Sequence, residues 1–94
     1  MIQAIDGPAI HGVMSVTTTA SEVKVGGTVQ IERKQITIYP TDGKIWYGYD
    51  NTVTSSTGTR VTKHQMLFLE VSDQLPVWIV SDSGTVDVRI TEAS

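Results

Sequence analysis

The 94-residue chain contains no cysteine, so disulfide bonds cannot stabilise its fold. Its two histidines, without any cysteine, leave no donor set with the ligand spacing of a structural zinc site. A domain of this length buries roughly 60–70% of the surface that its unfolded chain exposes. Its stability must therefore come from close packing of the core or from association with partner subunits.

Positive charge is also scarce, because seven Lys and Arg residues against ten Asp and Glu residues give a formal net charge of −3. The basic residues are scattered, and their densest stretch is the dipeptide Arg33-Lys34. This is not the footprint of a nucleic-acid-binding surface, so we expect no nucleic-acid partner. The first residues carry no basic region ahead of an apolar run, and no stretch approaches the roughly 18 apolar residues of a membrane helix. We therefore expect no signal peptide and no membrane partner, and we place the protein in the cytoplasm or in an assembly that forms there.

Helix signals are missing too, because no window of about a dozen residues repeats its apolar positions every 3.6 residues. Thr and Val dominate instead, with 13 and 12 copies, and β-branched residues favour strands. Apolar residues alternate at a period of two between clusters of turn residues. We predict an all-β fold, namely a small antiparallel β-sandwich or partly open barrel of about seven to eight strands.

Two parts of this pattern are specific enough to place strands. Residues 35–39 and 44–49 alternate on either side of Pro40-Thr41-Asp42-Gly43, whose residue types favour a tight turn, so we predict a hairpin there. Residues 85–91 form the clearest half-buried strand, in which the positions facing the core are Val86, Val88 and Ile90.

The N-terminal residues differ from the rest of the chain because Gly7-Pro8 interrupts any strand pattern. We predict an extended N-terminal arm over residues 1–12. Residues 13–94 then form one β-sandwich domain, with no linker and no second domain.

Three predicted strands carry large apolar side chains on both faces, although a two-layer sandwich buries only the inner face of each sheet. Trp46 opposes the Ile45 face, Met66 and Phe68 oppose the leucines of their strand, and Trp78 opposes Ile79. Aromatic residues and Met are enriched at protein interfaces. We predict that the surplus forms an interface made of Trp46, Met66, Phe68 and Trp78, together with Ile2, Ile5 and Ile10 of the arm. Alternatively, the arm or a loop of the same chain covers these side chains, or some are simply exposed.

Few residues of the sequence suit catalysis or metal binding, and local structure explains those that are present. His11 and His64 share no metal-ligand spacing, and His64 lies in a predicted turn as a solvated surface histidine. The chain has no nucleophile elbow and no phosphate-binding glycine loop. We expect no catalytic residue, no metal and no cofactor, although a Ser/His/Asp cluster assembled in space stays open. The acidic residues in predicted turns, where a carboxylate bonds to the backbone, are Asp42, Asp50, Asp73 and Asp82.

The aromatic residues also suit a sugar-stacking platform, which makes a carbohydrate-binding or host-recognition module the alternative function. Tyr47 and Tyr49 are more simply explained as core or rim residues of a strand. The platform would consist of Trp46, Tyr47, Tyr49 and Trp78.

Several short motifs between Ile45 and Glu92 resemble those of small virion proteins of tailed bacteriophages. In that family, a Tyr-Tyr-Gly, Asp, Val-Thr and Gly pattern precedes a closing strand that reads Gly-Thr, Asp-Val-Arg-Val and Glu. Trp46 stands here for the first Tyr, and Lys63-His64 replaces a Pro-Gly turn. The segments that carry the resemblance are Arg33–Ile38, Ile45–Asp50, Val53-Thr54, Gly58-Thr59, Val77–Val80 and Gly84–Glu92.

This resemblance implies a β-sandwich on a phage particle and no enzymatic activity. We expect a structural virion protein, assembled in the host cytoplasm, whose favoured role is capsid decoration and whose alternative is a neck or tail component. Its partners would be the major capsid protein or another virion protein. It would act as a homo-oligomer such as a trimer, and its arm could add a strand to a neighbour's sheet edge.

Overall fold

The computed structural model describes residues 9–94, and these residues form eight strands and no helix. The prediction of an all-β sandwich is therefore confirmed, and the two four-stranded sheets do not close into a barrel. The strands are β1 (Ala9–Val16), β2 (Ser21–Glu22), β3 (Gln35–Pro40), β4 (Ile45–Gly48), β5 (Thr59–Val61), β6 (Leu67–Leu69), β7 (Trp78–Val80) and β8 (Val86–Ala93).

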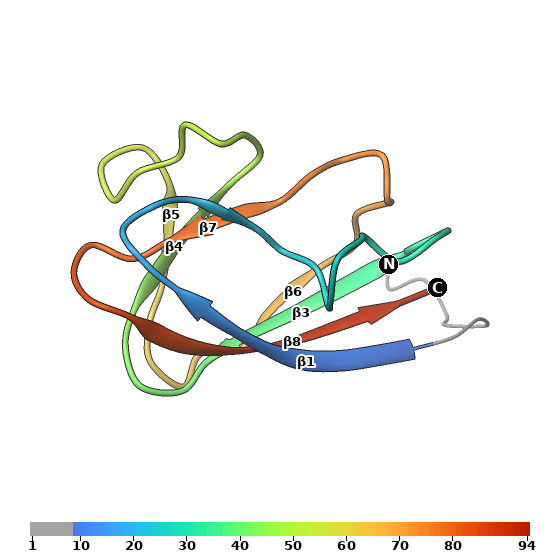
Figure 1. Cartoon of the computed structure of the whole chain (residues 1–94), viewed down its shortest axis with the longest axis horizontal. Coiled ribbons are helices and arrows are strands. Elements are labelled where there is room, and N and C mark those ends of the chain that lie inside the picture. The colour runs from blue at the N-terminus through green and yellow to red at the C-terminus, as the bar shows by residue number, and fades with distance from the viewer. Residues whose placement is uncertain (1–8) are drawn as a thin grey trace.

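The first sheet has the strand order β1-β8-β3-β6, and the second has the order β2-β7-β4-β5. In Figure 1, β1, β8 and β3 run side by side across the view, while β4 and β5 cross them at a steep angle. Among the described strands, only β4 and β5 are consecutive neighbours within one sheet. Every other connection between them passes from one sheet to the other.

The predicted hairpin of residues 35–39 and 44–49 is wrong, because β3 and β4 belong to different sheets. The turn between them is held by β8 of the first sheet. The backbone N–H of Thr41 donates to the carbonyl of Asp87 over 2.9 Å, and the N–H of Asp87 donates to Asp42 Oδ1 over 2.8 Å. These bonds hold the turn against the first residues of β8 in the first sheet, while β4 continues into the second sheet, so the turn forms a corner of the sandwich.

The structure also moves the predicted boundary between arm and domain. Residues 9–12 belong to β1 and pair with β8, from Ala9 opposite Ala93 to Gly12 opposite Ile90. Gly12 fits because a Cβ there would lie 2.9 Å from Val25 Cγ1, closer than real side chains approach. The rest of the predicted arm, with Ile2 and Ile5, lies outside the described residues.

The core fills the space between the two inner faces. Val86, Val88 and Ile90 of β8 are buried in it, as their alternation predicts. The strands β3 and β7 contribute Ile36, Ile38 and Ile79 from opposite layers. The other buried members of this cluster are Val16, Val23, Ile45, Val61 and Val77.

A fully buried ion pair lies at one end of this core. Arg33 Nη1 lies 3.0 Å from Glu92 Oε2, and both side chains are inaccessible to solvent. Arg33 Nη2 also donates to the carbonyls of Ser72 (2.7 Å) and Leu75 (2.9 Å). Glu92 Oε1 accepts from the N–H of Val25 over 2.9 Å. The pair therefore ties β8 to the β2–β3 segment and to the β6–β7 loop.

We predict that Arg33→Ala lowers the free energy of unfolding by about 3–5 kcal/mol, because it leaves the Glu92 carboxylate buried without its cation. Urea titration measures the change. Arg89→Ala is the matched control, since Arg89 pairs with Asp87 on the surface, and its midpoint should stay near that of the wild type. Equal midpoints for the two variants would contradict a structural role for the buried pair.

A second prediction concerns acid stability. The Thr41 hydroxyl, which donates to Asp87 Oδ2 over 2.6 Å, and the Arg89 guanidinium hold the pKa of Asp87 below its ordinary value of 3.8. The resulting stabilisation is complete above the unfolded-state pKa and is lost as the pH falls through the lower folded-state pKa. Below pH 3.8, the melting temperature of the wild type should therefore fall more steeply than that of Asp87→Asn. If the melting temperatures of the two proteins fall in parallel over this pH range, the stabilising role of the Asp87 carboxylate is refuted.

Candidate interaction surfaces

The β4–β5 loop covers Trp46 on the outer face of the second sheet. Trp46 is 9% exposed and packs against Val53 of that loop and Val80 of β7, with Ala20 and Trp78 at the margin. Trp46 is therefore not available as an interface residue, and this part of the prediction is corrected. The alternative that a loop of the same chain covers the second face holds for Trp46.

Glycine residues let this loop lie flat on its own strand. A Cβ at Gly48 would lie 2.8 Å from Val53 Cγ2, and a Cβ at Gly58 would lie 2.7 Å from the same atom. The loop also carries internal hydrogen bonds. Asp50 Oδ1 accepts from the N–H and the hydroxyl of Thr52, at 3.0 Å and 2.6 Å, and the hydroxyl bond is the main cause that lowers the pKa of Asp50. The loop is therefore a packed and hydrogen-bonded part of the fold.

Trp78 is half-buried at the margin of this cluster, where β7 pairs with Glu22 of β2. It also borders an open groove of about 550 Å³ that reaches Val13 and Met14 of β1. Trp78 is thus partly available to a partner, but it lies in the second sheet. Phe68 lies in β6 of the first sheet, and Met66 directly precedes that strand.

On the outer face of the first sheet, in contrast, no loop of residues 9–94 packs over the apolar side chains. Val13 is 58% exposed, Met66 is 65% exposed and Phe68 is 40% exposed. Strand register places Phe68 beside Thr37 and Val13 beside Arg89. We call this surface the open face, and its side chains are His11, Val13, Thr37, Tyr39, Met66, Phe68, Arg89 and Thr91.

Tyr39 is a member of the open face that the sequence reasoning missed. Its ring stacks on His64, with centroids 6.1 Å apart and an interplanar angle of 18°. His64 occupies the left-handed region at φ 63° and donates its N–H to the Pro40 carbonyl, so it sits in a turn, as predicted. The signal for Tyr39 was present, because it alternates with the inward-facing Ile36 and Ile38.

The structure therefore does not bring the predicted interface residues to one surface. Met66 and Phe68 share the open face, whereas Trp46 and Trp78 belong to the other sheet. Ile10 lies in β1 at an even-numbered position, on the side of the strand opposite to Val13. Ile2 and Ile5 lie outside the described residues.

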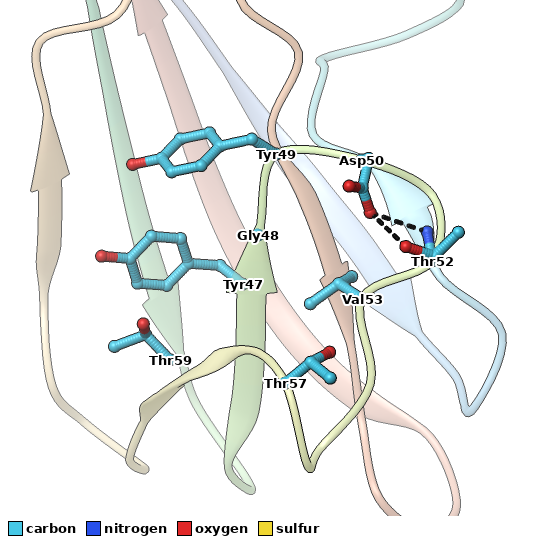
Figure 2. A pocket seen from close by; sticks show the side chains of 8 residues that line it. All are labelled: Tyr47, Gly48, Tyr49, Asp50, Thr52, Val53, Thr57 and Thr59. Carbon is cyan, nitrogen blue, oxygen red and sulfur yellow. Dashed lines mark hydrogen bonds between the residues drawn. The ribbon is translucent and has the colours of Figure 1, made fainter.

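An aromatic depression of about 420 Å³ lies at the end of β4. Figure 2 shows the side chains of Tyr47 and Tyr49 projecting from one side of β4, with the loop residues Thr52, Val53 and Thr57 on the other side. The two tyrosine rings meet edge to face, with centroids 6.2 Å apart and an interplanar angle of 86°. Trp46 and Trp78 are not part of its lining, so the predicted platform of four aromatic residues is not assembled.

Within residues 9–94, no three His, Asp or Glu side chains gather as a metal site would require. Three of the predicted turn aspartates accept backbone N–H groups: Asp42 from Asp87, Asp50 from Thr52, and Asp73 from Glu32. The described segments also contain no helix that could cross a membrane.

In comparisons with known proteins, no family model and no curated protein matches this chain. The surfaces described above therefore carry the functional reasoning.

The covering role of the loop predicts a fluorescence change. In a Trp78→Phe background, where Trp46 is the reporter, Gly58→Ala should shift the emission to longer wavelengths. The added Cβ would lie 3.0 Å from Trp46 Cβ and 3.0 Å from the Tyr47 carbonyl, so the loop must lift and admit water. Gly27→Ala is the control, because a Cβ there meets nothing within 4 Å. An unshifted emission for Gly58→Ala would contradict the packing of the loop on Trp46.

Proposed function

We propose that this chain is a structural virion protein, most specifically a capsid decoration protein, that attaches through its open face. One observation carries this proposal. Three large apolar side chains, Val13, Met66 and Phe68, stay exposed on the outer face of one sheet, while a loop covers Trp46 on the outer face of the other sheet. A partner surface on the open face would remove these side chains from water.

The energy available from such an attachment is modest for each copy. Full burial of one Val, Met or Phe side chain contributes about 1.5–3 kcal/mol, and association itself costs several kcal/mol. Arg89, His11 and the threonines of the open face would supply the polar part of the contact. Attachment of many copies to one particle would raise the overall avidity without any further contact.

The resemblance to small virion proteins of tailed phages supports the same role. The segments that carry it lie in or directly beside β3, β4, β7 and β8, in the β4–β5 loop and at the start of β5, and they include both members of the buried ion pair, Arg33 and Glu92. The resemblance therefore covers residues that build the core and the covering loop. A neck or tail component of the particle would use the same fold and the same open face.

Under this proposal, the partner is the major capsid protein or another virion protein, and the protein resides in the virion. We further propose that it assembles as a homo-oligomer such as a trimer, because symmetric copies multiply the attachment points on a symmetric shell. The proposal requires neither a cofactor nor a catalytic residue.

We predict that Phe68→Asp reduces attachment at least tenfold. The change places a charge where the phenyl ring would be desolvated, and about 1.4 kcal/mol already corresponds to a factor of ten. The measurement is co-sedimentation of the purified protein with capsids of its own phage that were assembled without it. The melting temperature should change little, because Phe68 is not a member of the buried core.

Ile31→Asp is the matched control, because Ile31 is the most exposed large apolar residue among residues 9–94 and lies in the β2–β3 segment, outside the strands that form the open face. Its attachment should equal that of the wild type. Normal attachment of Phe68→Asp, or an equal loss in both variants, would overturn the role of the open face.

A further inference from the structure

We propose that the depression at the end of β4 is a binding site for a neutral saccharide. The site belongs to the second sheet and its β4–β5 loop, so it does not rest on attachment through the open face of the first sheet. The residues that carry the inference are Tyr47, Tyr49, Asp50 and Thr59.

The two tyrosines provide aromatic surface in a fixed arrangement. Tyr49 is 49% exposed, and its ring meets that of Tyr47 edge to face. Tyr47 is partly buried against the core, which fixes the inner ring, while the outer ring stays open to solvent. A tyrosine ring offers an apolar face and a polar hydroxyl, and the faces of a sugar ring are likewise apolar while its rim carries hydroxyls.

Polar groups lie around these rings and have unused hydrogen-bonding capacity. Figure 2 shows both tyrosine hydroxyls pointing to the same side, and Thr59 of β5 lies opposite Tyr47 in the strand register. Neither tyrosine hydroxyl has a hydrogen-bond partner within residues 9–94. A ligand that both donates and accepts hydrogen bonds, as every sugar hydroxyl does, would satisfy them.

Asp50 adds a fixed acceptor at the rim. Its Oδ1 atom is occupied by the two bonds from Thr52, which orient the carboxylate and leave Oδ2 for a ligand. The same bonds lower the pKa of Asp50, so the group is ionised at neutral pH and accepts bonds from hydroxyl donors.

The charge of the lining selects the class of ligand. The residues that border the depression include one carboxylate and no Lys, Arg or His. An anionic ligand, such as a phosphorylated or sialylated compound, would meet repulsion without a compensating cation. A proline-rich peptide also docks on aromatic side chains, but the two tyrosine hydroxyls and Thr59, which lies opposite Tyr47 in the strand register, match a polyhydroxylated ligand better.

The site is also preformed. The loop wall is held by the Asp50–Thr52 bonds, by the N–H of Gly58 donating to the Thr54 carbonyl over 2.8 Å, and by Val53 packing on Trp46. Binding therefore costs little ordering of the loop. The depression is open and shallow, so we expect millimolar dissociation constants for single sites.

The test titrates the full chain with neutral and acidic oligosaccharides at millimolar concentrations, and the ring resonances of Tyr47 and Tyr49 are observed by NMR. We expect saturable shifts of these resonances. Tyr49→Ala should bind the oligosaccharide at least tenfold more weakly, whereas Tyr49→Phe, which keeps the aromatic ring, should lose only a few-fold in affinity.

Tyr39→Ala is the matched control, because it removes a tyrosine from the open face and should leave saccharide affinity unchanged. Unmoved tyrosine resonances in millimolar neutral oligosaccharide, preference for acidic oligosaccharides or for a proline-rich control peptide, or unchanged affinity in Tyr49→Ala would each overturn the site. The result is independent of capsid attachment, which Phe68→Asp tests on the other sheet.

Discussion

The buried Arg33–Glu92 ion pair is the contact on which the arrangement of the rest of the structure depends. Glu92 lies on β8, the strand that pairs with both β1 and β3, and Arg33 reaches it from the segment just before β3. Removing either charge would leave the other buried without compensation, which costs several kcal/mol. The two long connections that the pair holds, β2–β3 and β6–β7, have little secondary structure of their own. Because the chain has no disulfide bond, this polar cluster is what cross-links the two connections to β8.

The outer faces of the two sheets differ in whether a loop covers their apolar side chains, and both proposals follow from that difference. The β4–β5 loop covers Trp46 with Val53 and leaves the two tyrosines at its edge. In the part of the chain that the structure describes, no comparable loop lies over the apolar side chains of the first sheet, and Val13, Met66 and Phe68 are exposed. The rigid sheets thus present one flat surface suited to a macromolecule and one small depression suited to a small ligand.

Period-two alternation predicted which side of its strand a residue occupies, and it did so well. Val86, Val88 and Ile90 point inward, and Met66 and Phe68 point outward, as their spacing requires. Alternation contains no information on which sheet a strand joins. For that reason the turn at residues 40–43 was interpreted as a hairpin, although its bonds to Asp87 make it a corner between the sheets.

The sequence by itself determined the all-β class, the two faces of each strand and the excess of large apolar side chains, because these follow from local residue types and spacing. Only the tertiary structure decided which of those side chains are covered. Trp46 and Phe68 have the same outward pattern in sequence, yet a loop packs on one and nothing among the described residues covers the other. The pairing of Arg33 with Glu92 could not be predicted from the sequence either, because the two residues are 59 positions apart along the chain and only the fold brings their charges together.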